Sequence, residues 1–271
     1  MTTIRVPDAD DARLDVFTNL TNHQLRNRVD PGRGVLVAES EIAIRVALEE
    51  GIEPLAFLLS EKKLSAMEDV LAGVRDDVPV YVLTPEEAER LTGYRVTRGA
   101  LCAMRRPVNP DLAALLANAC RVVVLEGLTD ASNVGAAFRN AAALGADAVV
   151  VAPTCADPLC RRAVRVSMGN VFRLPWTFAP RPWPGESVRA LGEAGFIRLA
   201  LALSDDAVSL RDARGLAGPN GKVALFLGAE GPGLTSEVIE GCDASVIIPM
   251  AHGTDSLNVA AASAVAMWEL F

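Results

Sequence analysis

A glycine-rich turn near the C-terminus is the first place where this sequence could do chemistry. The turn contains Gly228, Gly231 and Gly233 around one carboxylate, Glu230, and it follows an apolar run at residues 223–227. Short apolar runs bounded by turn residues are typical of buried strands. Glycine permits positive φ and lets a ligand approach bare backbone. The stretch therefore predicts a strand that ends in a ligand-binding turn.

Two further groups of polar residues also follow predicted strands. Ser256 and Asn258 come after the apolar run at residues 244–249, and Asn133 and Arg139 come after the run at residues 121–125. In an open α/β sheet, ligands bind in crevices at the carboxyl ends of the strands. We therefore expect these loops and the glycine turn to form one crevice.

The helix expected at residues 134–144 would present Arg139 away from the core. Val134, Phe138 and Ala141 fall on one apolar face, and a residue one position after Phe138 points about 100° away from it. Each polar residue also has a structural interpretation. Asn133 and Ser256 could be helix N-caps, Glu230 a turn acid and Arg139 a surface ion-pair residue.

Several familiar kinds of site are excluded by their motifs. The glycine turn matches neither G-x-G-x-x-G nor the phosphate-binding P-loop pattern. The two histidines stand apart, and the five cysteines are scattered without a C-x-x-C pair. A metal site, a Ser-His-Asp set and a disulfide framework are therefore not expected.

The charge of the chain is negative overall but unevenly distributed. A formal net charge of −8 argues against general nucleic-acid binding. Residues 158–185 and 92–110 nevertheless contain arginines and no acid, and a further cluster surrounds Arg26 and Arg28. Guanidinium groups bind phosphates in a bidentate manner. These stretches are either ordinary solvated faces or a localised surface for an anionic polymer.

The length of the chain, 271 residues, fits two domains. We expect a loose leader at residues 1–20, an α/β domain at 21–106, a proline-containing linker at 107–111 and a second α/β domain at 112–271. Thr84 and Glu87 have the spacing of a capping box. The first residues do not look like a signal peptide, and no apolar run reaches the roughly 18 residues of a membrane helix. We therefore expect a cytoplasmic protein without a membrane segment.

Three segments resemble, in order and spacing, the signature motifs of the SpoU family of S-adenosylmethionine-dependent RNA 2′-O-ribose methyltransferases. They are Asn133-Val-Gly-Ala-Ala-Phe-Arg139, Leu227-Gly-Ala-Glu-Gly-Pro-Gly-Leu234 and Ile248-Pro-Met through Ser256-Leu-Asn-Val-Ala260. The resemblance covers residues 120–271, and residues 22–106 look like the α/β RNA-binding domain that many members carry. It implies a trefoil-knotted C-terminal domain. It also implies a homodimer formed through that domain, which would explain why the last predicted helix, residues 256–270, is apolar nearly all round. A central helix of a monomer would explain that pattern as well.

The resemblance also assigns roles to individual residues. It implies that Arg139 is catalytic, as a base or as an electrostatic clamp, with Asn133, Glu230, Ser256 and Asn258 orienting the site. Glu230 is the expected partner of Arg139. S-adenosylmethionine would be held by Leu227, Gly228, Ala229, Glu230, Gly231, Ile248, Pro249, Met250, Ser256, Leu257 and Asn258. RNA would be bound by Arg26, Arg28, Arg139, Arg161 and Arg165.

The substrate implied is structured RNA, ribosomal RNA before transfer RNA. Two alternatives of other classes remain: a non-catalytic RNA-binding or ribosome-assembly protein on the same fold, and a Rossmann-type nucleotide enzyme. The missing dinucleotide fingerprint counts against the second.

Overall fold

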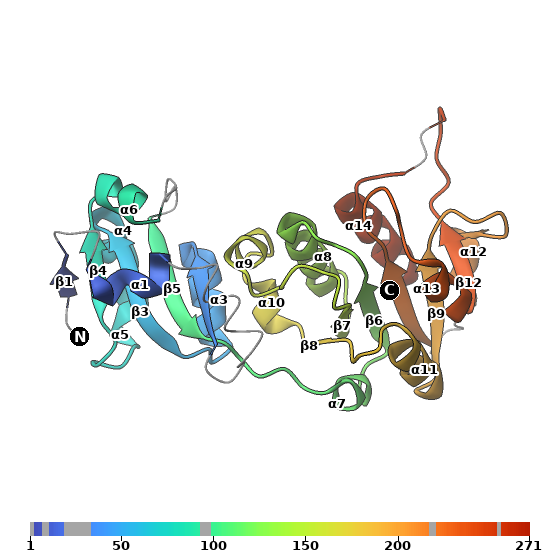
Figure 1. Cartoon of the computed structure of the whole chain (residues 1–271), viewed down its shortest axis with the longest axis horizontal. Helices are drawn as coiled ribbons and strands as arrows, with labels where there is room; N and C mark the ends of the chain where they lie inside the picture. Colours follow the sequence, from blue (N-terminus) through green and yellow to red (C-terminus); the bar gives the residue numbers. More distant parts are fainter. Residues whose placement is uncertain (1–2, 7–10, 19–33, 93–98, 217–220, 254–255) are drawn as a thin grey trace. The chain divides into compact units, whose positions relative to one another are not determined.

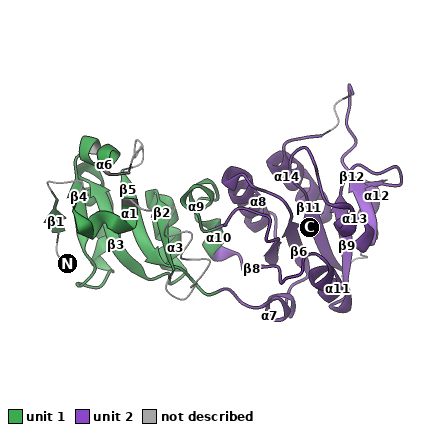
Figure 2. Cartoon of the chain, in the orientation of Figure 1, with its two compact units in different colours: residues 1–108, 159–172 green, residues 109–158, 173–271 purple. Residues whose placement is uncertain are grey.

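The computed structural model of the chain describes residues 3–6, 11–18, 34–92, 99–216, 221–253 and 256–271. Figure 2 shows its two compact units. Unit 1 comprises Met1–Val108 and Leu159–Phe172, and unit 2 comprises Asn109–Pro158 and Arg173–Phe271. The division after Val108 falls inside the linker expected at residues 107–111. The segment Leu159–Phe172, which we expected in the C-terminal domain, groups with unit 1 instead, because its helix packs on a strand of that unit.

Unit 1 is built on a mixed sheet whose described strands have the order β1-β4-β3-β5-β2. β1, β4 and β3 run parallel, whereas β5 is antiparallel to both β3 and β2. The strands are β1 (Thr3–Arg5), β2 (Val35–Glu39), β3 (Pro54–Ser60), β4 (Val80–Leu83) and β5 (Ala100–Arg105). The helices are η1 (Ala12–Leu14), α1 (Asp15–Thr18), α3 (Glu41–Glu49), α4 (Glu61–Ala66), α5 (Glu68–Ala72), α6 (Pro85–Thr92), α9 (Arg161–Val166) and α10 (Asn170–Arg173), the last ending one residue beyond the unit.

The described residues of the expected leader, 3–6 and 11–18, are packed rather than loose. β1 adds a parallel strand to β4, and Val6, Leu14 and Phe17 are almost completely buried in the core of unit 1. The acidic residues around them concealed these few apolar side chains, whose burial holds the segment in place. The capping box is confirmed: Thr84 N donates to the Glu87 carboxylate at 2.7 Å, and Glu87 N donates to Thr84 Oγ1 at 3.2 Å.

Unit 2 is built on a sheet whose described strands run parallel in the order β10-β12-β9-β11-β6-β7-β8. The strands are β6 (Arg121–Leu125), β7 (Ala148–Val151), β8 (Trp176–Phe178), β9 (Phe196–Leu201), β10 (Val208–Ser209), β11 (Lys222–Leu227) and β12 (Ala244–Ile247). The helices are α7 (Leu112–Leu116), α8 (Ala131–Ala143), α11 (Gly185–Glu193), α12 (Leu210–Ala213), α13 (Ser236–Gly241) and α14 (Val259–Leu270). The α/β class that the sequence predicts is therefore confirmed.

Helices cover both faces of this sheet (Figure 1). Val122 and Val124 of β6 pack in one core cluster with side chains of α7, α11 and α13. Because side chains alternate along a strand, Val123 and Leu125 point to the opposite face, where α8 and α14 pack against each other. The strands are nearly continuous apolar runs because both faces are buried. No described helix has the length and apolar character needed to cross a membrane.

One ion pair joins the beginnings of two neighbouring strands in unit 2. Arg198, in β9, donates through its guanidinium to both carboxylate oxygens of Asp243, at 2.9 and 2.6 Å. Asp243 directly precedes β12, and it also accepts from the Arg198 backbone N–H at 2.7 Å. The pair therefore fixes where β12 starts beside β9.

Replacing Asp243 by asparagine should weaken unit 2 in a pH-dependent manner. Hydrogen bonding from Arg198 lowers the pKa of Asp243, so the pair stabilises the fold above the unfolded carboxyl pKa of about 3.9 and loses this effect as the pH falls through the folded pKa. We expect D243N to reduce the free energy of unfolding at pH 7 by about 1 kcal/mol, because both side chains are partly exposed. The difference from wild type should shrink below about pH 4.

Urea unfolding followed by tryptophan fluorescence measures this, because all three tryptophans lie in unit 2. E193Q is the matched control, since the Arg189–Glu193 pair on α11 is about 70% exposed and its atoms are 3.8 Å apart. Equal effects of D243N and E193Q would contradict a specific role for Asp243.

Candidate functional site

The strand order of unit 2 changes direction between β6 and β11. The two strands are neighbours, yet the chain leaves β6 toward β7 on one side and leaves β11 toward β12 on the other. Loops that depart in opposite directions from adjacent parallel strands leave room for a ligand at the carboxyl ends. The motif residues that follow β6 and β11 therefore meet here, although they are far apart in the sequence.

The glycine turn after β11 folds back on itself through its backbone. Ala229 and Gly233 exchange two N–H to carbonyl hydrogen bonds, of 3.2 and 3.1 Å. Gly231 and Gly233 have φ of 88° and 71°, a region that side chains disfavour. At Gly228 a Cβ atom would lie 2.3 Å from the Gly233 carbonyl carbon. The turn therefore requires glycine at position 228 for space and at 231 and 233 for conformation.

A cavity of about 440 Å³ lies at the carboxyl ends of β9, β11 and β12. Most of its lining is apolar side chain or bare backbone, and Glu230 and Ser256 contribute polar groups. Of the residues that we expected to hold a cofactor, those lining the cavity are Leu227, Gly228, Ala229, Glu230, Gly231, Ile248, Met250, Ser256 and Leu257. Pro249 and Asn258, both described, are not part of this lining.

Glu230 joins the three motifs through two asparagines. Its Oε1 atom accepts a hydrogen bond from Asn133 Nδ2 at 3.0 Å, across 97 positions of sequence, and another from Asn258 Nδ2. The expected ion pair between Glu230 and Arg139 does not occur among the described residues. Two neutral amides hold the carboxylate instead, so the guanidinium is left for other partners.

The two asparagines differ in their structural roles. Asn133 is not the N-cap of α8: Asp130 caps that helix by accepting from Ser132 N at 2.8 Å. Asn133 lies within the first turn, where its amide is able to reach Glu230. The last helix begins at Val259 rather than at Ser256, and Asn258 is its N-cap, accepting from Ala260 N at 2.9 Å. Asn258 therefore caps α14 with its oxygen and binds Glu230 with its nitrogen.

Arg139 is exposed on α8, as its spacing from the buried Phe138 predicts. The next residue, Asn140, donates through Nδ2 to the carbonyl oxygen of Ala260 at 2.7 Å and to Ser263 Oγ at 2.9 Å. These bonds fasten α8 to α14 and fix how α8 is rotated. Asn133 before Arg139 and Asn140 after it therefore both hold α8 in place, and Arg139 faces solvent.

The other arginines expected to bind RNA have different surroundings. Arg26 and Arg28 lie outside the described residues. Arg161 and Arg165, on α9, both donate to Glu39, at 2.6 and 3.3 Å. Glu39 is fully buried, and a buried carboxylate requires such partners. Part of the positive charge of α9 is therefore already neutralised within unit 1.

Two features of the site were not foreseen from the sequence. Leu201 and Leu203, at and just after the end of β9, line the cavity. The sequence could have indicated them, because a strand was expected there and strand ends form the ligand edge of such a sheet. Glu126, directly after β6, is buried and hydrogen bonded to the loop that follows the glycine turn. Nothing in the local sequence distinguishes it from an ordinary turn acid.

Cys155 lies beside the end of β6 but is not a nucleophile. Its thiol donates to the Leu125 carbonyl oxygen at 3.3 Å. Burial raises the pKa of this thiol to about 11, so it is protonated at neutral pH and unreactive.

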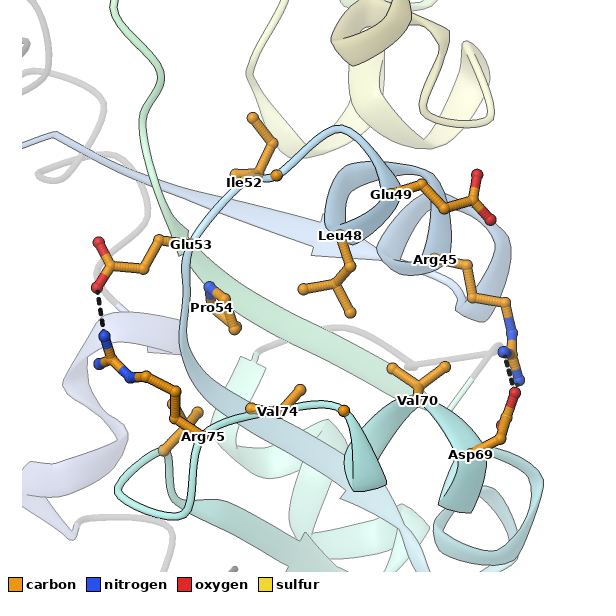
Figure 3. A pocket seen from close by; sticks show the side chains of 13 residues that line it. Arg45, Leu48, Glu49, Ile52, Glu53, Pro54, Asp69, Val70, Val74 and Arg75 are labelled. Atoms are coloured by element: carbon orange, nitrogen blue, oxygen red, sulfur yellow. Dashed lines mark hydrogen bonds and ion pairs between the residues drawn. The ribbon is translucent and has the colours of Figure 1, made fainter.

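A second hollow, of about 630 Å³, lies in unit 1 (Figure 3). Its two arginines are both ion paired: Arg45 with Asp69 at 2.6 Å and Arg75 with Glu53 at 3.5 Å. The remaining lining is largely apolar or backbone. This hollow brings together no set of groups resembling that around Glu230.

Comparison with known proteins identifies the family of this chain. The family model described as the SpoU rRNA Methylase family matches residues 121–268. An uncharacterized tRNA/rRNA methyltransferase of Mycobacterium tuberculosis is 42% identical over 97% of this chain and 90% of its own. The 23S rRNA (guanosine-2′-O-)-methyltransferase RlmB of Vibrio cholerae is 33% identical over 55% of this chain and 57% of its own.

Solved structures agree over nearly the whole chain. The SpoU methyltransferase AviRb from Streptomyces viridochromogenes, in complex with AdoMet, has a TM-score of 0.79 and 25% identity, covering 96% of this chain and 97% of AviRb. An AdoMet-bound rRNA methyltransferase from Sinorhizobium meliloti also has a TM-score of 0.79, at 22% identity, covering 99% and 97% of the two chains, and it supports the fold. The family match contains every element that carries Asn133, Arg139, Glu230 and Asn258, and with the long mycobacterial alignment it shows that this chain belongs to the SpoU rRNA methylase family.

Proposed function

We propose that this chain transfers a methyl group from S-adenosylmethionine to a ribose 2′-hydroxyl of structured RNA, ribosomal RNA in the first place. As a SpoU family member it is an RNA methyltransferase, and S-adenosylmethionine is its cofactor. The observation that supports the finer proposal is the meeting of Asn133, Glu230 and Asn258 beside a cavity lined by apolar side chains and by the glycine turn. A cavity of this kind suits a small molecule such as a cofactor, and a protein that only binds RNA does not require one.

The cavity suits this cofactor in size and chemistry. Ligand pockets measure roughly 300–1,000 Å³ and are mostly apolar, with a few polar groups that fix orientation. The glycine turn offers bare backbone, Ile248 and Leu257 offer apolar surface, and Ser256 offers a hydroxyl. S-adenosylmethionine supplies a methyl group already activated on a sulfonium. The protein therefore has to align the acceptor hydroxyl, favour loss of its proton and exclude water.

Arg139 is the residue that we assign to the acceptor. An arginine keeps its charge at any ordinary pH, because its intrinsic pKa is above about 12. A fixed positive charge can bind the phosphate next to the target ribose and stabilise the oxyanion that develops on its 2′-oxygen. Its exposure and its freedom from Glu230 support this electrostatic role over that of a base. Asn133, Glu230, Ser256 and Asn258 would orient the ribose and the cofactor around it.

Ribosomal RNA is favoured as substrate because RlmB of Vibrio cholerae is named as a 23S rRNA (guanosine-2′-O-)-methyltransferase. Transfer RNA is the second candidate, since the mycobacterial relative is named for both RNAs. Unit 1 would add affinity through arginines such as Arg26 and Arg28, with Arg161 and Arg165 contributing from α9. We place this activity in the cytoplasm.

We also propose that the chain is a homodimer whose unit 2 is knotted at its C-terminal end. α14 supports the dimer: Ala266 and Met267 are fully buried, whereas Trp268 and Val265 are 77% and 43% exposed. One side of this apolar helix therefore packs against α8 and the other side presents a large aromatic residue to solvent. A second copy of the chain would cover that side.

The first test identifies the product and assigns Arg139. Purified protein, tritium-labelled S-adenosylmethionine and total RNA should yield labelled RNA, whose nuclease digestion releases 2′-O-methylated nucleosides. We expect R139A to lower the rate by at least about 100-fold, as removal of a transition-state charge does. Calorimetry should find its affinity for S-adenosylmethionine nearly unchanged.

R189A is the matched control, because Arg189 is an exposed arginine of unit 2 that belongs to none of the three motifs. Label found on a base rather than on ribose would reject the 2′-O assignment, and full turnover by R139A would reject the role of Arg139. Label appearing in transfer RNA alone would select the second substrate.

Gly228→Ala tests whether the glycine turn forms the cofactor site. The added Cβ collides with the backbone of Gly233 and Leu234, so no change of rotamer relieves the overlap. Backbone strain of about 1–3 kcal/mol should weaken S-adenosylmethionine binding by about tenfold to a hundredfold. Gly185→Ala is the control, because a Cβ there meets nothing within 4 Å and its φ is not positive. Equal affinities for the two variants would remove the turn from the site.

Trp268→Asp tests the dimer. A carboxylate at this exposed position costs a monomer little, but it would place an unpaired charge in an interface. Because aromatic anchors contribute about 2 kcal/mol or more, we expect dimerisation to weaken by at least about 30-fold. Sedimentation velocity measures this, with Val108→Asp, an 80% exposed apolar residue of unit 1, as control. A wild-type protein that sediments as a monomer would refute the proposal.

A further inference from the structure

Glu126 is a buried acid that the reaction described above does not use. It follows β6 directly, and only 3% of its surface is exposed. Its carboxylate accepts three hydrogen bonds, from Trp183 Nε1 at 2.7 Å, from Thr235 N at 2.8 Å and from Thr235 Oγ1 at 3.0 Å. Among the described residues, no cation neutralises it. A buried carboxylate is costly unless such donors surround it, so its position calls for a specific explanation.

Glu126 holds both ends of the glycine turn. Its backbone N–H donates to the Leu227 carbonyl oxygen at 2.9 Å, at the point where β11 ends and the turn begins. Its carboxylate binds the backbone and the hydroxyl of Thr235, where the turn has ended and α13 begins. One residue, directly after the neighbouring strand β6, therefore bridges the base of the loop that contains Glu230.

This bridge matters because the turn has few other constraints. Its residues from 229 to 233 are partly or fully exposed, and inside it the bonds between Ala229 and Gly233 close only the tip. Glycines at 228, 231 and 233 make the turn conformationally free, and ordering it on ligand binding costs free energy unless other contacts already restrain it. The bonds from Glu126 remove that freedom at the base.

Trp183 ties a third segment to the same carboxylate. It lies in the loop between β8 and α11, and its ring packs against the core cluster that contains Leu234 and Val238. The indole N–H shares Glu126 Oε1 with the Thr235 hydroxyl. The carboxylate therefore connects the loops that follow β6, β8 and β11 behind the wall of the cavity.

We propose that Glu126 is a positioning residue for the cofactor: it preorganises the glycine turn so that its backbone can hold S-adenosylmethionine. This inference rests on the proposed function, because it takes the cavity to be the cofactor site. Glu126 touches neither ligand nor reacting atoms. It acts through Thr235 and Leu227 on the turn that contributes Glu230 to the cavity.

Glu126→Gln is the sharpest single change, because it keeps the shape of the side chain. The amide has one oxygen and one NH₂ group, and the NH₂ group cannot accept from Thr235 or Trp183. At least one of the three donors must then remain unpaired. Since an unpaired buried donor is costly, we expect the dissociation constant for S-adenosylmethionine to rise by about tenfold. The KM for S-adenosylmethionine should rise with it, while the KM for RNA stays unchanged.

Thr235 supplies a matched pair that does not alter the buried charge. Thr235→Ser keeps both donors and should bind S-adenosylmethionine as wild type does. Thr235→Val keeps the volume but loses the hydroxyl donor, and it should weaken binding by several-fold. Trp183→Phe should behave like Thr235→Val. This pair decides the question if Glu126→Gln fails to fold by circular dichroism.

Hydrogen exchange of the full-length protein without ligand provides the readout independent of activity. Amides of residues 229–235 should exchange faster in Glu126→Gln than in wild type, whereas amides of β7, in the same sheet, should not change. Unchanged exchange in the turn together with unchanged affinity, in Glu126→Gln or in Thr235→Val, overturns the inference. If wild type binds no S-adenosylmethionine, both the proposed function and the positioning role of Glu126 are rejected. If wild type and variants all bind S-adenosylmethionine normally, the positioning role of Glu126 is rejected and the proposed function stands.

Discussion

The site depends on the divergence of the chain from two adjacent parallel strands. β6 and β11 are hydrogen bonded along their whole length, but the chain continues from them to opposite sides of the sheet. Their carboxyl ends therefore lie side by side, while the loops that follow them depart in opposite directions. The Asn133–Glu230 hydrogen bond joins these two loops, and the Glu126 carboxylate accepts from Thr235, at the end of the glycine turn.

Part of the cavity wall is the bare backbone of the glycine turn, and this has consequences for the residues around it. A backbone wall can approach a ligand closely, but only if its glycines are held in one conformation. In this protein the restraint comes from outside the turn. Asn133 and Asn258 hold Glu230 at the rim, whereas Glu126 holds Leu227 and Thr235 at the base.

Local ion pairs, rather than the net charge of the chain, decide which arginines are free to bind an anion. The chain carries a formal charge of −8, and several of its arginines are engaged by carboxylates within their own unit. The Glu39 carboxylate accepts hydrogen bonds from Arg161 and Arg165, which lie more than 120 positions later in the sequence. An acid-free arginine stretch in the sequence is thus not necessarily a free cationic surface. Arg139 differs because the carboxylate expected to pair with it is taken by two amides.

The sequence by itself determined the strands, the turn and the motifs, because these depend on neighbouring residues. Apolar runs predicted β6, β11 and β12, the capping box at Thr84 predicted its own hydrogen bonds, and the three motifs indicated the family. Only the tertiary structure decided which polar groups meet. It placed Leu14 and Phe17 in a core, gave the N-cap of α8 to Asp130, paired Glu230 with asparagines and buried Glu126 behind the turn. Local patterns record how a segment folds, but the partner of a side chain about a hundred residues away is set by the order of strands in the sheet.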